Sequence, residues 1–416
     1  MTMQENANRP VAIIGYGTAG VNAAIALRNS GYDGAITVFS DHGGLPYSPI
    51  LTSYYAGGEK ELEECFPWTA DELDDLSVSV IGEAVVELDP EAHAIRTSAG
   101  EYAYAKCVIA TGANPTTVGF PAVQGDSAYE PLVLRSIEDA ERLKAVLESP
   151  ACKRFLVSGA SMVALKTLEA ALNRGKECTL VGMNPHVLDF NALPEVAARF
   201  EKGLREKGVA LRLGQTIQAV ERADGKLAVT FSNGESEAFD EIAVSHGMKS
   251  NLAFVKPGSL NIDRGLVVDE FMRTSNPDVY AAGDVAQATE LISGDKRIVG
   301  IWKNAALQGA CAGAAIAAEM RGARPDSAGA LKGSISTNTI AVNGTLFISA
   351  GTMELTDGRR VEIRETEDMT LAVIYEQSEA QGERIVGFNL ACDHDEPGGE
   401  AYDIGAMLTL RIEKCL

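Results

Sequence analysis

Short apolar runs and helical segments alternate along the first half of the chain. An apolar run at 11–14 leads into a segment from Val21 to Arg28 that has the small side chains of a packed helix, and a second apolar run follows at 35–39. The same order returns later, with a strand from Arg154, a helix and a strand at 178–181. Strands that alternate with helices form parallel sheets covered by helices. The pattern predicts an α/β fold with two doubly wound domains.

The rest of the chain shows strand patterns joined by turn residues. Alternating residues at 78–81 and 84–88 predict a small antiparallel excursion, after which a buried strand returns the chain to the parallel sheet and ends at Gly112. A stretch with Pro, Gly and Ser after Gly322 indicates a linker. Beyond it we expect an antiparallel layer with strands at 336–342, 346–350, 361–364, 371–375 and 384–388, closed by a helix at 403–413.

The turn after the first strand carries three glycines with the spacing Gly-x-Gly-x-x-Gly. The first permits a tight turn, the second lets the backbone approach a diphosphate, and the third allows the helix to pack closely on the strand. The helix N-terminus is then left to hold negative charge. Asp41 follows the second strand at the distance expected of an acid that binds an adenosine ribose. The predicted cofactor contacts in this turn are Gly15, Gly17, Thr18, Ala19 and Gly20.

The end of another strand is expected to lie in the same ligand-binding crevice as the glycine turn. An apolar strand stops at Gly283, and Asp284 follows at once. This carboxylate would point out of the sheet edge, where it can accept a hydrogen bond from a ribityl hydroxyl. The helix that begins near Trp302 and includes Gln308 would face a ring carbonyl with its N-terminal amides. We therefore expect Gly283, Asp284 and Gln308 to contact the cofactor.

The second strand-turn-helix unit lacks the glycines of the first. Ser158, Ala160 and Val163 are aligned with the three expected glycines, and Gly182 is aligned with the expected ribose acid or phosphate-binding Arg. Side chains at these positions would crowd a diphosphate. If a nicotinamide dinucleotide binds to this unit, it does so at Ser158, Gly159 and Ala160 without the usual glycines.

Two prolines and three tyrosines follow Asp41 between residues 45 and 58. In a nucleotide-binding domain this position lies beyond the carboxyl ends of the strands, where the reactive end of a ligand sits. Tyr47, Thr52 and Ser53 are therefore candidates for contact with cofactor or substrate. The alternative is that the tyrosines cover a hydrophobic edge.

Composition and charge narrow the function classes. The net charge of −22 argues against nucleic acid or an anionic membrane as a partner. We expect a cytoplasmic protein, because residues 1–10 lack the pattern of a secretory signal and the small-residue run 305–318 is better explained as a buried helix. The seven cysteines include no Cys-x-x-Cys pair. Cys392, His394 and Asp395 have no complementary cluster, so we expect no metal site.

Together these stretches resemble the flavin-dependent pyridine nucleotide-disulfide oxidoreductase superfamily, in the branch of the nitrite reductase flavin domains and the rubredoxin reductases. The resemblance implies two Rossmann-like domains in a glutathione reductase-like arrangement and a C-terminal α+β domain for dimerisation or docking. It implies FAD at the first glycine turn, with Asp284 as ribityl ligand and the family's strand-turn motif at Ala110, Thr111 and Gly112. The implied domains are 1–122 and 246–330 for FAD, 123–245 for NAD(P)H, and 331–416 at the C-terminus.

Departures from the family pattern narrow the expected chemistry. No cysteine lies between 41 and 64, so the resemblance does not extend to a redox dithiol or a peroxidatic cysteine. Rubredoxin reductase-like members have a lysine near the flavin paired with a glutamate after the second glycine motif. The matching positions here are Ser53 and Leu165, give or take one residue for the second, with Lys166 nearby. The lysine and the glutamate of this pair are expected to be lost together, because a buried charge without a partner is costly.

The sequence thus predicts an FAD-dependent oxidoreductase that passes electrons from NAD(P)H through the flavin to a small-molecule or protein acceptor. One alternative is an electron-transfer subunit of a larger complex that has lost NAD(P)H binding. Another is a non-catalytic flavin-binding sensor or scaffold. Docking of an acidic redox protein would need a local basic patch. Its candidates are Arg359, Arg360 and Arg364, which are alternatively exposed turn residues.

Overall fold

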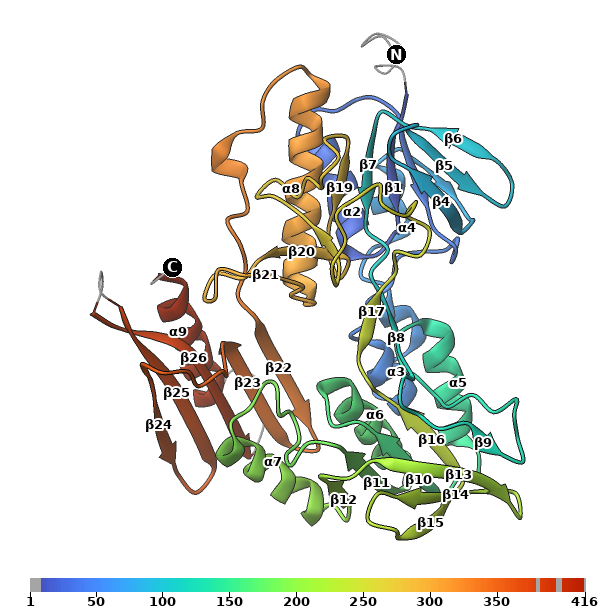
Figure 1. Ribbon diagram of the computed structural model, residues 1–416, viewed down its shortest axis with the longest axis vertical. Coiled ribbons are helices and arrows are strands. Elements are labelled where there is room, and N and C mark those ends of the chain that lie inside the picture. Colours follow the sequence, from blue (N-terminus) through green and yellow to red (C-terminus); the bar gives the residue numbers. More distant parts are fainter. Residues whose placement is uncertain (1–8, 379–381, 394–398, 415–416) are drawn as a thin grey trace. The chain divides into compact units, whose positions relative to one another are not determined.

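The computed structural model describes residues 9–378, 382–393 and 399–414. The chain forms two compact units, each assembled from three segments (Figure 1). Unit 1 comprises Met1–Ser48, Phe66–Asn114 and Lys249–Ile335. Unit 2 comprises Pro49–Cys65, Pro115–Met248 and Ser336–Leu416. Unit 2 therefore groups the predicted C-terminal domain with the second doubly wound sheet.

Unit 1 is built on a five-stranded parallel sheet in the order β19-β7-β1-β2-β3. β1 is buried along its whole length, as its continuous apolar sequence requires in a sheet covered on both faces. The strands are β1 (Val11–Ile14), β2 (Ile36–Phe39), β3 (Val78–Ile81), β7 (Lys106–Ile109) and β19 (Val279–Ala281).

The prediction that 78–81 belongs to an antiparallel excursion was wrong. β3 pairs in parallel with β2, with Val38 opposite Val80. β3 is an edge strand whose residues are half-buried or exposed, and its sequence Val-Ser-Val therefore alternates as in a half-exposed antiparallel strand. The excursion itself starts later, as the antiparallel sheet of β4 (Val85–Asp89), β5 (Ala94–Thr97) and β6 (Glu101–Ala103).

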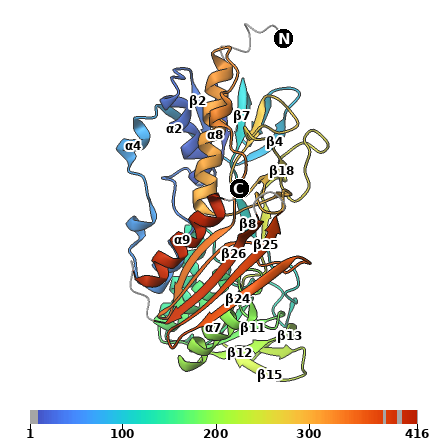
Figure 2. The same ribbon diagram turned by 90° about the vertical axis from the view of Figure 1, so that its left-hand side faces the viewer.

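Two helices of small residues pack against each other in unit 1. These are α2 (Thr18–Asn29) and α8 (Trp302–Met320), which lie side by side in Figure 2. A Cβ atom at Gly309 or Gly313 of α8 would overlap the backbone of α2 at Ala19 or Ala23. The small-residue run at 305–318 is therefore a buried helix, as predicted, and over the described residues no helix has the length and apolarity needed to cross a bilayer.

Shorter elements complete unit 1. A small sheet joins three strands, and one α-helix and one 3-10 helix lie in the connections. These elements are β18 (Leu266–Val267), β20 (Ala286–Thr289), β21 (Lys296–Arg297), α4 (Ala70–Asp74) and η2 (Ser327–Gly329). β8 (Ala113–Pro115) pairs with β17 (Met248–Ser250), and the boundary between the two units falls within these strands.

Unit 2 repeats the parallel architecture in a four-stranded sheet of order β12-β11-β10-β16. A second sheet has the order β15-β14-β13-β9. The strands are β9 (Val123–Gln124), β10 (Arg154–Ser158), β11 (Glu177–Gly182), β12 (Ala210–Leu213), β13 (Ile217–Ala223), β14 (Lys226–Phe231), β15 (Ser236–Phe239) and β16 (Glu241–Val244). The helices are α3 (Thr52–Gly57), η1 (Leu62–Cys65), α5 (Ile137–Glu148), α6 (Met162–Asn173) and α7 (Pro194–Glu206).

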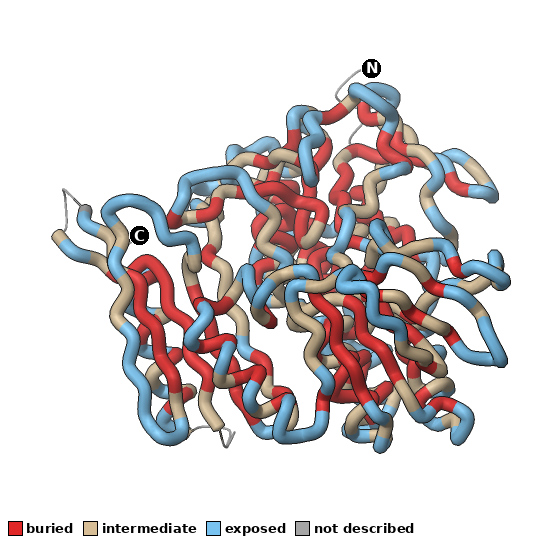
Figure 3. The backbone as a smooth tube through the Cα atoms, turned by 60° about the horizontal axis from the view of Figure 1, so that its bottom comes forward, coloured by how far each residue is buried: buried red, intermediate tan, exposed pale blue. Residues whose placement is uncertain are grey.

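The C-terminal part of unit 2 is a five-stranded antiparallel sheet of order β22-β23-β26-β25-β24. Its central strands are buried and its edge strand β24 is more exposed (Figure 3). Its elements are β22 (Thr337–Val342), β23 (Thr345–Gly351), β24 (Arg359–Glu365), β25 (Met369–Ser378), β26 (Gly382–Asp393) and α9 (Glu400–Lys414).

Helices cover both faces of this antiparallel sheet. Gly405 of α9 lies against Ile348, whereas Gly203 of α7 lies against Thr345. Ile348 and Thr345 are three residues apart in β23, so their side chains point to opposite faces. Because α7 connects β11 to β12 of the second parallel sheet, this contact explains why the C-terminal layer belongs to unit 2.

Candidate functional site

The turn after β1 has the backbone geometry that a dinucleotide site needs. Gly15 has a φ of +102°, and a Cβ atom there would overlap the carbonyl of Ala110. A Cβ atom at Gly20 would overlap the Gly15 carbonyl. Glycine is therefore required at both positions by the protein itself, the first for the turn and the third for close packing of helix on strand.

Gly17 differs from Gly15 and Gly20, because the protein itself does not require glycine at this position. A Cβ atom built there meets nothing within 4 Å among the described residues, so the protein leaves the space beside it open. Gly17 is the N-cap of α2, and none of the described side chains caps this helix end. The first amides of α2, from Thr18 and Ala19, are thus available to an anion, and the open space and free helix N-terminus fit a diphosphate.

The loops after β1 and β7 lie at the point where the strand order changes direction, which is where open α/β sheets bind ligands. Ala110 N donates to Ile14 O at 2.7 Å, so the stretch from Ala110 through Thr111 to Gly112 continues directly from the sheet. Thr111 Oγ1 donates to the carbonyl of Asn251 at 2.7 Å. Asp41 stands two residues past β2 with a side chain that is 65% exposed, at the same carboxyl edge as Gly15.

The strand end at Gly283 is fixed by a side chain from α8. Gly283 N donates to Gln308 Oε1 at 2.8 Å, and Gln308 is buried. The next residue, Asp284, lies beside Gly300, where a Cβ atom would come within 3.2 Å of Asp284 Oδ1. Gln308 thus supports the turn that presents Asp284, and Gly300 allows the chain to pass close to this carboxylate.

Sequence reasoning missed Asn304 in the first turn of α8. Its Nδ2 donates to Val299 O at 2.7 Å, while its Oδ1 is buried and has no hydrogen-bond partner in the part of the chain that the structure describes. A buried acceptor without a donor fits a group supplied by a ligand. The spacing Asn-x-x-x-Gln at the start of this helix is the signal that could have identified it.

The three candidate catalytic residues are divided between the units. Tyr47 belongs to unit 1 and contacts the His42 ring edge to face at 5.7 Å. Thr52 and Ser53 belong to unit 2, at the start of α3. Both are buried, and their hydroxyls donate to the carbonyls of Pro49 at 2.8 Å and Ile50 at 3.4 Å. Their catalytic role stays a prediction.

The structure shifts the alignment of the second glycine motif by one residue. β10 ends at Ser158, and Gly159 has a φ of +124° with its Cβ position against the Ser245 carbonyl, as Gly15 has against Ala110. Ser161 is the N-cap of α6, as Gly17 is of α2. The motif is therefore Gly159-x-Ser161-x-x-Ala164, in which the tight turn is kept and only the middle position is changed to a residue with a polar side chain.

Four polar side chains surround this second turn. Ser158 Oγ lies 2.9 Å from His246 Nε2, and His246 Nδ1 donates to Val118 O at 3.0 Å. Ser161 Oγ lies 2.9 Å from Ser245 Oγ and accepts a hydrogen bond from Ala164 N at 3.3 Å. Among these residues only Ser158 was a candidate from the sequence. His246 was not predicted, because no other histidine or cysteine stands near it in the sequence and it follows an ordinary buried strand.

The one-residue shift of the motif moves the position expected to match the glutamate of the resembled family from Leu165 to Lys166. Its Nζ forms an ion pair with Glu169, lies 3.8 Å from the centre of the Tyr54 ring, and donates to Ala341 O at 3.3 Å. The side chains of Lys166 and Glu169 are 11% and 10% exposed. The charge of Lys166 is thus neutralised by Glu169, one turn along the same helix.

The described cysteines have no geometry for redox chemistry. All six are free thiols, and five are buried. Burial raises the pKa of Cys152 to about 11 and that of Cys178 to about 12, and burial also raises the pKa of Cys107. These thiols remain protonated near neutral pH and are poor nucleophiles. His394 and Asp395, considered with Cys392 as a metal corner, lie outside the described residues.

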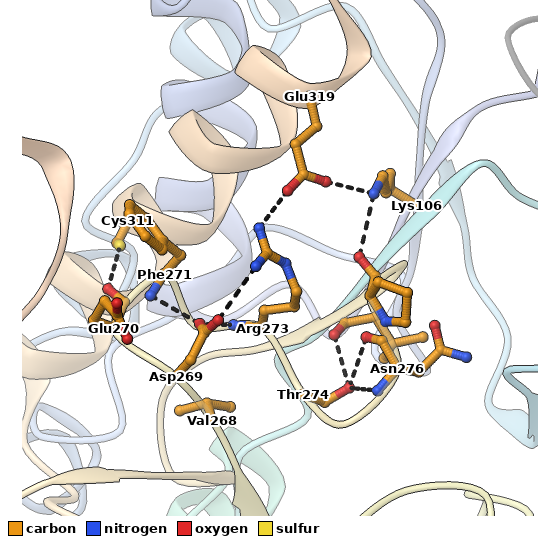
Figure 4. Close-up of polar contacts among 12 residues, drawn as sticks. Lys106, Val268, Asp269, Glu270, Phe271, Arg273, Thr274, Asn276, Cys311 and Glu319 are labelled. Carbon is orange, nitrogen blue, oxygen red and sulfur yellow. Dashed lines mark hydrogen bonds and ion pairs between the residues drawn. The ribbon is translucent and has the colours of Figure 1, made fainter. Parts of the chain in front are cut away.

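The opposite, amino edge of the unit 1 sheet carries a network of ion pairs (Figure 4). Glu319 of α8 pairs with Lys106 and Arg273, and Arg273 also pairs with Asp269 at 3.3 Å. Burial alone would raise the pKa of Glu319, but the hydrogen bond and charge of Lys106 hold it below its ordinary value. Because the network joins β7 to α8 at the edge away from Gly15, we assign it a structural role.

Comparisons with known proteins show the family to which the chain belongs. Residues 9–309 match the model of the family described as pyridine nucleotide-disulphide oxidoreductase. The chain is 32% identical over 282 residues to the nitric oxide reductase FlRd-NAD(+) reductase of Aliivibrio fischeri, covering 67% of this chain and 72% of that one. It is 30% identical to the rubredoxin-NAD(+) reductase of Pseudomonas putida, covering 68% and 74%.

Solved structures show the same fold. An NAD-dependent persulfide reductase from A. fulgidus superposes with a TM-score of 0.85 at 25% identity, covering 97% of this chain and 77% of that one. The covalent putidaredoxin reductase–putidaredoxin complex gives a TM-score of 0.82 at 24% identity, covering 97% and 94%, and so supports the fold alone. The predicted α/β fold is thereby confirmed. The chain is an oxidoreductase that belongs to the pyridine nucleotide-disulphide oxidoreductase family.

Proposed function

We propose that this protein is an FAD-dependent oxidoreductase that passes electrons from NAD(P)H directly to a small-molecule or redox-protein acceptor, without a redox disulfide. One observation carries the proposal. Two dinucleotide turns of the same design, at Gly15 and Gly159, occur in a chain whose described cysteines are free and mostly buried. Two nucleotide sites without a reactive thiol fit direct transfer from one nucleotide to the other.

The residues of unit 1 fit FAD. The amides at the start of α2 would hold the diphosphate, Asp41 the adenosine ribose, and Asp284 a ribityl hydroxyl, while Gln308 keeps the Gly283 turn in place. Bound flavin would supply the hydride-accepting ring. The protein's part is to orient that ring and exclude water. Asn304 Oδ1, which has no hydrogen-bond partner among the described residues, offers an additional acceptor for the ligand.

The relatives indicate the class of partner reaction. Their names describe a rubredoxin-NAD(+) reductase, a putidaredoxin reductase and an NADH oxidase. For this chain the acceptor is therefore a small redox protein or a small molecule. The basic patch expected for protein docking is already compensated, because Arg360 bonds Glu383 at 2.6 Å and Arg364 bonds Glu362 at 2.6 Å. Arg359 likewise pairs with Glu376 at 2.9 Å.

Location in the cytoplasm is part of the proposal. The six cysteines of the described residues are free thiols, which fits a reducing compartment. Fractionation of the native host with an antibody to the chain would test it, and recovery of the protein outside the cytoplasmic fraction would contradict it.

Anaerobic mixing with NADH and, separately, with NADPH tests the function. We expect NADH or NADPH to bleach the visible absorbance band of the oxidised flavin rapidly after mixing. Absence of bleaching with both donors would instead favour an electron-transfer subunit that has lost NAD(P)H binding or a flavin-binding sensor. Purification without flavin, combined with failure to reconstitute it, would contradict all three functions.

A further inference from the structure

Two side-chain hydrogen bonds cross the second dinucleotide crevice. β10 and β16 are neighbours in the sheet order β12-β11-β10-β16, and the crevice lies between the loops that follow them. The Ser158–His246 and Ser161–Ser245 bonds each join the loop after β10 to the loop after β16, both at 2.9 Å. We name Ser158, Ser161, Ser245 and His246 the closure.

Ser161 also occupies the anion position of α6. Its Oγ accepts a hydrogen bond from Ala164 N at 3.3 Å, so a protein hydroxyl uses an amide that would otherwise face a diphosphate. At the corresponding position of α2, Gly17 has no side chain and leaves the amides open. The two sites therefore differ at their N-caps, because one is open to an anion and the other is capped by its own serine.

The hydrogen bond from His246 to Val118 determines which atom donates in the Ser158–His246 bond. The Val118 carbonyl can only accept, so the proton on Nδ1 is donated to it and neutral His246 presents Nε2 as an acceptor. Ser158, which is buried, then donates its hydroxyl proton to Nε2 at 2.9 Å. The hydroxyl of Ser158 and the imidazole are thus both engaged by protein groups.

We propose that the closure sets the affinity of the second site, because an entering diphosphate must displace the Ser161 hydroxyl from the amide of Ala164 and break the Ser161–Ser245 bond. This inference rests on the proposed use of NAD(P)H and deepens it. It gives the protein a tight, open site for a resident dinucleotide and a weaker, closed site for a dinucleotide that leaves after each turnover. Ser161 is the residue that distinguishes them.

Calorimetric titration of ADP-ribose into the flavin-loaded protein tests the proposal. ADP-ribose carries the diphosphate but no nicotinamide, and bound flavin blocks the first site. Ser161→Gly removes the hydroxyl and keeps an acceptable N-cap, and we expect it to lower the Kd about fivefold, the factor equivalent to one capping hydrogen bond. Ser245→Ala removes only the bond between the serines, so we expect a smaller decrease. Thr69→Gly removes the cap of α4 in unit 1 and should leave the Kd unchanged.

The outcomes separate this inference from the proposed function. A tighter Kd for Ser161→Gly, or binding by this variant where the natural protein shows none, supports the closure. An unchanged or weaker Kd in both serine variants, or no binding in any form, overturns it. Bleaching of the flavin by NADH or NADPH is recorded separately on the natural protein. If no bleaching occurs while Ser161→Gly still tightens ADP-ribose binding, the proposed function fails and the closure stands.

Discussion

Gly17 and Ser161 occupy equivalent places in two turns of the same design, and this contrast predicts the effect of exchanging the residue in unit 1. Gly17→Ser should fold normally, because a Cβ atom there meets nothing within 4 Å among the described residues. The new hydroxyl would cap α2 and fill the space left for the diphosphate. We expect the variant to lose flavin during gel filtration while the natural protein retains it, as measured by the ratio of flavin to protein absorbance.

A matched glycine elsewhere in unit 1 provides the control for this exchange. Gly100 also has open space at its Cβ position within the described chain, and it lies in the turn before β6 rather than at a strand end of the parallel sheet. Gly100→Ser should keep its flavin. Equal flavin retention by Gly17→Ser and Gly100→Ser would show that the diphosphate does not lie at Gly17.

The sequence revealed the first turn at the level of single residues but misplaced the second. At residues 15–20 the three glycines stand out against a clear apolar strand. At residues 158–164 the sequence Ser-Gly-Ala-Ser leaves the end of the strand ambiguous, and only the pairing of β10 with β11 and β16 fixes it at Ser158. His246 could not be found from sequence, because its partners come from residues 88 and 128 positions away.

Within unit 2, the pair Lys166–Glu169 connects elements that are far apart in sequence. Lys166 contacts Tyr54 of α3 and Ala341 of β22, and Glu169 accepts a hydrogen bond from Asn343 N at 2.7 Å. Replacing Lys166 with Met leaves Glu169 buried without its partner charge. We expect Lys166→Met to lower the free energy of unfolding by about 3 kcal/mol, as measured by urea denaturation.

The control for this variant is an ion pair of the same type on an exposed helix surface. Lys144 pairs with Glu148 at 2.6 Å on α5, and the two side chains are 30% and 43% exposed. Lys144→Met should leave the urea midpoint essentially unchanged. A similar loss in both variants would mean that the Lys166 pair contributes no more than a surface contact.

The Glu319 network predicts a pH dependence of unit 1. Although burial alone would raise it, the folded pKa of Glu319 lies below the ordinary value of 4.5, mainly because of Lys106. The stabilisation is therefore complete above about pH 5 and is lost as pH falls through the folded pKa. Glu319→Gln should lower stability at neutral pH and reduce the further loss on acidification. Urea denaturation of both proteins from neutral to acid pH measures this, and parallel curves would contradict the assignment.

The elements were predictable to different degrees. The five C-terminal strands and the small-residue helix were located correctly, because each has a distinct period or composition and is bounded by turn residues. β3 was misassigned because a half-exposed edge strand has the alternation of an antiparallel strand. α3 was not predicted as a helix because it is short and prolines precede it, and its position depends on packing against α5 and α6.

For the whole molecule, the sequence identified the family and the cofactor class but not the grouping of segments. Residues 49–65 and 336–416 join the second parallel sheet in unit 2, through contacts of α3 with α6 and of α7 with the antiparallel sheet. Local patterns do not encode such long-range packing. The three arginines proposed for docking lie in β24, and each forms an ion pair with a glutamate. The chain as a whole has a net charge of −22. These arginines therefore do not form a basic patch for an acidic partner.

The central claim is that electrons pass from NAD(P)H to the flavin and onward without a protein disulfide. Anaerobic titration of the flavin-loaded protein with NADH or NADPH tests it most directly, because the absorbance of the flavin counts the electrons taken up. We predict complete bleaching by about one equivalent of nucleotide per flavin. No bleaching by either nucleotide, or uptake of about two equivalents before the end point, would contradict the account, since the second result requires another two-electron centre such as a redox disulfide.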